Sequence, residues 1–146
     1  MVTLRHVGLT VSNKEDYCQL LVSTFGFEKV WDEIETGDYI NKFNGEVVDY
    51  VNTVKFKDSN GAMLELLCYE KNNSVHKIKS LRNQGITHLA LSVTDIDNII
   101  SQLDCTWFRL VHEPLVVPSG AVKVCFIEDM KNGFFLELVE DFRTSP

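Results

Sequence analysis

The sequence predicts an α+β fold built from two tandem βαβββ modules. Three observations lead to this prediction: a strand-like segment with one histidine occurs twice, a helix-like segment follows each copy, and each half closes on the motif Asn-Gly-x-x-Leu-Glu-Leu. An internal repeat of this kind indicates a duplicated structural unit. The 146 residues are enough for one ordinary domain with a real core.

The first strand of each module is predicted at residues 5–12 and 87–94. Apolar side chains alternate there with small or polar ones, which is typical of a strand that packs one face and exposes the other. His6 and His88 occupy the same point of this alternation, on the face opposite the apolar positions. Those positions are Val7, Leu9 and Val11 in the first copy and Leu89, Leu91 and Val93 in the second.

A helix is predicted after each of these strands. Ser12 and Glu15 fit a capping box in the first copy, and Gly26 is expected to end the helix. Thr94 and Asp97 fit the same capping box in the second copy. Apolar residues at helical spacing follow both boxes; they are Tyr17, Leu20 and Leu21, and then Ile96, Ile99, Ile100 and Leu103.

The two modules are predicted to close with similar hairpins. Each Asn-Gly pair, at residues 60–61 and 132–133, is a strong turn signal, and the strands before the turns are expected at 51–57 and 121–128. In the strands that follow, Glu65 and Glu137 lie on the face opposite their neighbouring leucines. The first copy is longer, and its extra residues fall around positions 33–51.

We therefore expect a single domain, residues 1–146, made of module 1–70, linker 71–85 and module 86–146. The linker is rich in Asn, Lys and Ser. A module of this kind cannot bury both faces of its sheet alone, so pairing of the two copies would complete the fold.

Composition excludes several classes of protein. The formal net charge is −7 and no dense Lys/Arg cluster occurs, which argues against a nucleic-acid or anionic-membrane partner. No segment has the roughly 18 apolar residues of a membrane span, so a cytoplasmic location is expected. Four widely spaced cysteines form no C-x-x-C pair, and Cys68 and Cys125 are expected to be buried reduced thiols.

Two histidines and two glutamates occupy equivalent places in the repeat. If the copies pair about a pseudo-twofold axis, these side chains converge, and two carboxylates together would be costly without a cation. The sequence therefore predicts one divalent metal bound by His6, Glu65, His88 and Glu137. This set of two nitrogens and two oxygens suits Zn, Ni, Co, Fe or Mn, and the lack of a thiolate favours a catalytic over a closed structural site.

These motifs resemble the vicinal oxygen chelate superfamily, which includes glyoxalase I, methylmalonyl-CoA epimerase, extradiol dioxygenases, and fosfomycin and bleomycin resistance proteins. The resemblance spans residues 3–140 and is nearest to glyoxalase I-like and epimerase-like members. It implies a cupped, barrel-like mixed sheet with helices outside, and a homodimer. In glyoxalase I and the epimerases the positions that match the four residues are metal ligands.

Four protein ligands leave two open positions in an octahedral site, which suits a small-molecule substrate with two adjacent oxygens. The leading hypothesis is a metal-dependent isomerase, epimerase or lyase acting through an enolate or enediolate. The resemblance to glyoxalase I makes Glu137, with Glu65, the candidate catalytic base. A second possibility is an acidic residue of the insertion, namely Glu33, Glu35, Glu46 or Asp49. An iron-dependent extradiol dioxygenase and a non-catalytic binding or resistance protein are the alternatives.

Two departures bear on the substrate. Thr10 and Tyr69 stand where short bacterial glyoxalase I has an arginine that serves glutathione and an asparagine. These two departures make a glutathione adduct a less favoured substrate. The sequence does not decide whether the substrate carries glutathione or CoA. In the insertion, Tyr39, Ile40 and Phe43 are expected either to cap a pocket or to pack against the rim of the fold.

Overall fold

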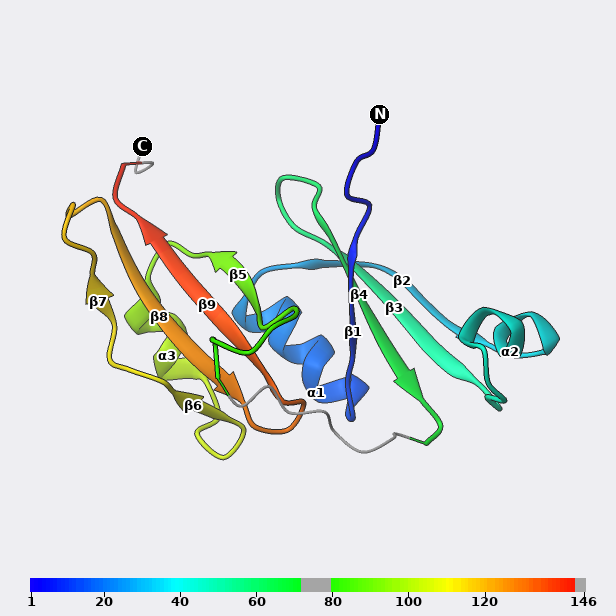
Figure 1. Cartoon of the computed structure of the whole chain (residues 1–146). Coiled ribbons are helices and arrows are strands. Elements are labelled where there is room, and N and C mark those ends of the chain that lie inside the picture. Colours follow the sequence, from blue (N-terminus) through cyan, green and yellow to red (C-terminus); the bar gives the residue numbers. More distant parts are fainter. Residues whose placement is uncertain (72–79, 144–146) are drawn as a thin grey trace. The chain divides into compact units, whose positions relative to one another are not determined.

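The computed structural model describes residues 1–71 and 80–143. The chain divides into two compact units, residues 1–74 and 75–146, and each holds one mixed sheet (Figure 1). The predicted α+β class and its two modules are confirmed. The described strands pair into two open sheets. They form no closed barrel, so the predicted barrel-like sheet is not closed. The predicted linker, 71–85, lies partly outside the described residues.

The two sheets repeat one topology. The first has the order β1-β4-β3-β2 and the second β5-β9-β8-β6, with β7 paired to β8. In each, the first strand is parallel to the last, and every other pairing is antiparallel. The strands are β1 (Val7–Thr10), β2 (Glu28–Glu35), β3 (Val51–Lys57), β4 (Met63–Tyr69), β5 (His88–Ser92), β6 (Phe108–Leu110), β7 (Leu115–Val116), β8 (Val122–Asp129) and β9 (Phe134–Asp141).

Both predicted helices are present, but each begins one residue later than the capping boxes indicate. The N-cap of α1 (Lys14–Gln19) is Asn13, whose side chain accepts the backbone N–H of Asp16 at 3.0 Å. The N-cap of α3 (Ile96–Gln102) is Asp95 in the same arrangement. Asn and Asp cap as well as Ser and Thr, so the predicted caps Ser12 and Thr94 were wrong by one position.

A π-helical turn extends the first helix. This element, η1 (Leu20–Thr24), buries Leu20 and Leu21. The chain then turns at Gly26, which has a φ of 72°. Glycine adopts this left-handed conformation without steric cost, and the predicted end of the helical segment at Gly26 is confirmed.

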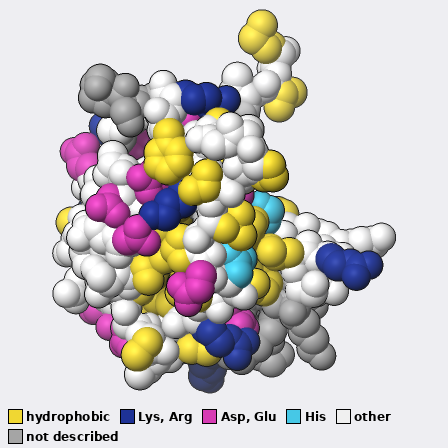
Figure 2. Space-filling view, turned by 90° about the vertical axis from the view of Figure 1, so that its left-hand side faces the viewer, with side chains coloured by type: hydrophobic (Ala, Val, Ile, Leu, Met, Phe, Trp, Pro, Cys, Tyr) yellow, Lys and Arg dark blue, Asp and Glu magenta, His cyan; other side chains and the backbone are white. Residues whose placement is uncertain are grey.

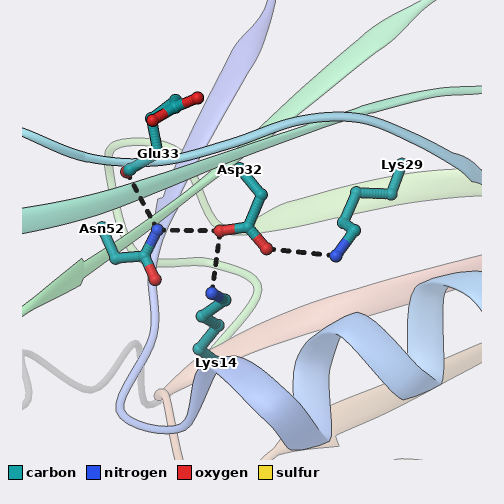
Figure 3. A network of polar contacts seen from close by, with 5 residues as sticks. All are labelled: Lys14, Lys29, Asp32, Glu33 and Asn52. Atoms are coloured by element: carbon teal, nitrogen blue, oxygen red, sulfur yellow. Dashed lines mark hydrogen bonds and ion pairs between the residues drawn. The ribbon is translucent and has the colours of Figure 1, made fainter.

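Helix α1 covers one face of the first sheet. Lys14 on α1 donates to Asp32 on β2, which also accepts from Lys29 and Asn52 (Figure 3). The apolar side chains of this face include the core residues Val54, Phe56, Leu64 and Leu66. Because side chains alternate along a strand, Glu65 lies on the opposite face.

The insertion of the first unit forms a short helix, α2 (Asp38–Asn44), at the end of the β2–β3 pair (Figure 1). Ile40 is 2% exposed and packs against Val48 and Val51. Phe43 is 86% exposed. Of the two expected roles, packing applies to Ile40, while Phe43 points to solvent.

All four cysteines are free thiols. Cys125 is buried and Cys68 half-buried, and burial raises the pKa of each thiol to about 11. None of the helices within residues 1–71 and 80–143 has the length and hydropathy needed to cross a membrane.

Candidate metal centre

The pairing of β1 with β4 brings His6 beside Glu65. Gly8 lies opposite Glu65 in the parallel register, and His6 is two residues before Gly8, so both side chains belong to the same face. The His6 Nε2 and Glu65 Oε1 atoms are 3.6 Å apart, and the Glu65 side chain is 13% exposed.

The second unit repeats this arrangement. Ala90 lies opposite Glu137 in the parallel pairing of β5 with β9, and His88 is again two residues earlier. The His88 Nε2 and Glu137 Oε2 atoms are 3.4 Å apart. The structure thus brings each predicted histidine together with the glutamate of its own unit.

Both pairs fit a divalent metal. Ligand nitrogen and oxygen atoms lie about 2.0–2.2 Å from such an ion, so two ligands at a right angle are roughly 3 Å apart. The observed separations of 3.6 and 3.4 Å need only a small closing movement. Each pair alone is half of the predicted ligand set, and the described residues contain no group of three or more His, Cys, Asp and Glu side chains placed to hold a metal ion.

A neighbouring hydroxyl contacts the His88 ring. The Thr87 hydroxyl lies 2.9 Å from His88 Nδ1. When this hydroxyl accepts the Nδ1 proton, Nε2 carries the lone pair that a metal requires, and it is Nε2 that faces Glu137. Thr87 is itself buried, so this contact limits rotation of the ring.

Lys55 is a residue at this site that the sequence analysis missed. It lies opposite Glu65 in the β3–β4 hairpin, and its Nζ atom is 3.6 Å from Glu65 Oε2. The same Nζ atom is 5.9 Å from the centre of the Trp31 ring. Counting outward from a two-residue Asn60-Gly61 turn would place Phe56 across from Glu65, whereas the observed register is centred on Asn60, so the turn motif alone does not reveal this pair.

The equivalent position of the second unit holds an aromatic residue. Phe126 lies opposite Glu137, and its ring meets the His88 ring edge-on at 5.4 Å between centroids. The backbone N–H of Phe126 donates to His112 Nε2 at 3.3 Å. Histidine also lies beside hydrophobic side chains on the face shown in Figure 2.

Among the four acidic residues of the insertion, Glu35 is held most firmly. It lies on β2 and accepts hydrogen bonds from the hydroxyls of Thr53 and Tyr39. Glu33 lies on the same strand with an exposed side chain. Glu46 and Asp49 come from the segment between α2 and β3 and lie outside the sheet.

The two positions that depart from glyoxalase I have ordinary structural roles. Tyr69 ends β4 and donates its hydroxyl to Asn44 Oδ1 at 2.6 Å, which ties the strand to α2. Burial, followed by the charges of Glu46 and Glu65, raises the pKa of this hydroxyl. Thr10 is exposed at the end of β1.

No family model and no curated protein matches the chain. Solved structures match over nearly its whole length. A glyoxalase family protein from Bacillus cereus has 19% identity and a TM-score of 0.81, covering 97% of this chain and 95% of its own. A glyoxylase/bleomycin resistance protein/dioxygenase domain from Frankia has 16% identity and a TM-score of 0.66, covering 99% and 96%.

A third similar structure contains a metal. It is the fosfomycin resistance protein FosX from Listeria monocytogenes, complexed with Mn(II) and a sulfate ion. Its identity is 15% and its TM-score 0.59, with 96% of this chain and 93% of that chain covered. At these identities the likeness is one of fold. The chain has the fold of these glyoxalase-family and FosX structures, and the resemblance found in the sequence is confirmed as one of fold.

Proposed function

We propose that this protein is a divalent-metal-dependent enzyme of the glyoxalase type, an isomerase, epimerase or lyase. Its metal ligands are His6, Glu65, His88 and Glu137. The observation that carries this proposal is the same close His–Glu pair at the same register in both units. A fold alone does not give this pattern, because neither pair is needed to pack a core.

The substrate class follows from the ligand count. Four protein ligands leave two positions for a small molecule with two adjacent oxygens. A bound Zn, Ni, Co, Fe or Mn ion would act as a Lewis acid toward negative charge that develops on those oxygens. We also propose a homodimer and a cytoplasmic location, as the resemblance and the composition suggest.

The chain's own residues supply the proton acceptor. Glu137, with Glu65, is the proposed base, since each carboxylate faces the same side of its sheet as the histidine beside it. Glu35 is the alternative base from the insertion, because two hydroxyls fix its position on β2. A positioned base contributes roughly 10²–10⁴-fold to the rate.

Metal content is the first test. Elemental analysis of purified protein should find close to one divalent ion per chain. His6→Ala and His88→Ala should each lose most of it. His112→Ala is the matched control, because His112 lies in neither His–Glu pair. Retention of the metal by both of the first two variants would overturn the proposed site.

The reaction is tested by solvent isotope exchange. Hemithioacetals of α-keto aldehydes and 2-substituted acyl-CoA esters are incubated in deuterated water, and entry of deuterium at the α-carbon is followed. Exchange with one substrate class and loss of exchange in Glu137→Gln would support the proposal. Oxygen uptake with catechols and no exchange would favour a dioxygenase, and inactivity in both assays would favour a binding protein.

A further inference from the structure

The two halves of the candidate metal centre differ in one charged residue. In the first unit, Lys55 stands opposite Glu65, and their charged atoms are 3.6 Å apart. In the second unit, Phe126 stands opposite Glu137, and among residues 1–71 and 80–143 no lysine or arginine is ion-paired with Glu137. The repeat therefore holds a positive charge in one copy only.

Glu65 is enclosed between two groups that compete for its oxygens. His6 approaches Oε1 and Lys55 approaches Oε2, both at 3.6 Å. The Glu65 side chain is 13% exposed and the Lys55 side chain 35%. A carboxylate so shielded from water depends on its partners for stabilisation, and Lys55 supplies a full positive charge whether or not a metal is present.

From this asymmetry we infer that Lys55 is an internal cation that competes with the metal for Glu65, so that the first unit contributes less than the second to binding of the shared ion. This inference rests on the proposed metal centre and describes how its loading is regulated. A divalent ion at Glu65 would stand a few ångströms from the ammonium group, and the two like charges repel. Metal binding must therefore displace Lys55.

The Trp31 ring can bind the displaced ammonium group of Lys55. It lies directly opposite Lys55 in the β2–β3 pairing, and its ring is within cation–π range of Nζ at 5.9 Å. Trp31 is 50% exposed, so the ammonium group can move toward its ring and water together. The exchange of one cation for another at Glu65 thus requires only a side-chain movement.

The test is metal affinity in a double-mutant cycle, measured by competition with a chromophoric chelator for Zn²⁺ and Mn²⁺. We expect Lys55→Met to bind the ion more tightly than the wild type by roughly fivefold or more, the ratio that a partly exposed ion pair is worth. In the Glu65→Gln background the same substitution should have a smaller effect, because no carboxylate then holds the ammonium group beside the ion. Lys57→Met is the matched control: Lys57 lies two residues along β3 on the same face and pairs with Glu28 instead.

Thermal unfolding gives a second readout that does not depend on activity. Without metal, Lys55→Met should melt below the wild type, since Glu65 has lost its cation, and added metal should raise its Tm more than that of the wild type. Equal affinity of Lys55→Met and wild type would overturn the inference and leave the metal centre intact. An equally large tightening in the Glu65→Gln background would do the same, because the effect of Lys55 would then not depend on Glu65. Absence of metal binding in every variant would overturn the metal centre and this inference together.

Discussion

Lys14 on α1 donates a hydrogen bond to Asp32 on β2, with 2.8 Å between Nζ and Oδ1. Asn52 and Lys29 donate to the same carboxylate. Burial raises the pKa of Asp32, but these three donors outweigh it and lower the pKa from 3.8 to about 2. The network joins the helix to the face of the sheet that is turned away from Glu65 (Figure 3).

The first prediction is a pH dependence of stability at Asp32. A carboxyl with a lowered pKa in the folded state stabilises the protein fully above its unfolded pKa, and this contribution is lost as the pH falls toward about 2. Asp32→Asn should therefore lower the free energy of unfolding by roughly 1 kcal/mol at pH 7. The difference from wild type should shrink below pH 4 and disappear as the pH falls through about 2.

Urea unfolding at several pH values measures this difference. Glu33→Gln is the control, because the neighbouring Glu33 side chain is exposed on the same strand and only its backbone oxygen joins the network. A pH-independent gap between Asp32→Asn and wild type would show that the charge of Asp32 is not what stabilises the contact.

Some features of the fold could be predicted from local patterns. The strand at 51–57 has the bounds that its alternation predicts, and each His–Glu pair follows from a period-2 register that places both side chains on one face. These features depend on residues close in the sequence or on the pairing of two strands. The same pairing occurs in both copies of the repeat, so the sequence reveals it. The helix caps were wrong by one residue because Asn13 and Asp95 compete for the role with the hydroxyl residues beside them.

Other features depend on contacts between distant segments. Helix α2 was missed because Gly37 and Gly45 bound a segment too short to show helical periodicity. Lys55 was missed because its role comes from its ion pair with Glu65 on the neighbouring strand, and the pattern of its own strand does not show that partner. Convergence of all four ligands on one ion stays a prediction, since it requires surfaces from the two repeats.

The second prediction concerns Gly8, the residue opposite Glu65. A Cβ atom added there would meet Glu65 Oε1 at 4.0 Å, which is ordinary van der Waals contact. The second unit already has Ala90 at the equivalent position. Gly8→Ala should therefore fold normally and gain about 0.4–1 kcal/mol, because alanine restricts the unfolded chain more than glycine does.

Metal content of Gly8→Ala should equal that of the wild type, while Gly8→Phe should lose metal because a large ring would compete for the space beside Glu65. Denaturant unfolding and elemental analysis of the two variants provide the measurements. Loss of metal in the alanine variant would mean that the His6–Glu65 pair needs an open backbone at this point.

The third prediction is a difference in reactivity among the cysteines. Only the thiolate attacks an alkylating reagent, and a thiol with a pKa of about 11 is roughly 0.1% ionised at pH 8. Cys125 and Cys68 should therefore resist iodoacetamide in the folded protein, whereas the exposed Cys105 should react first. Peptide mapping by mass spectrometry with and without urea checks this order, and Cys105→Ser should remove the fast phase. Labelling of Cys125 as fast as Cys105 would contradict the burial seen here.

The last prediction separates the two candidate bases on β2 and β9. If Glu35 moves the proton, Glu35→Gln should lower the rate of solvent deuterium exchange by roughly 10²-fold or more, with metal content unchanged because Glu35 lies in neither His–Glu pair. If Glu137 is the base, Glu35→Gln should keep most of the rate, while Glu137→Gln loses both exchange and metal. Glu33→Gln is the matched control for Glu35, since it removes a carboxylate from the same strand and leaves in place the carboxylate that accepts from the Thr53 and Tyr39 hydroxyls. Equal losses of exchange rate in Glu33→Gln and Glu35→Gln would mean that neither residue is the base. The effect would then come from the total negative charge of β2.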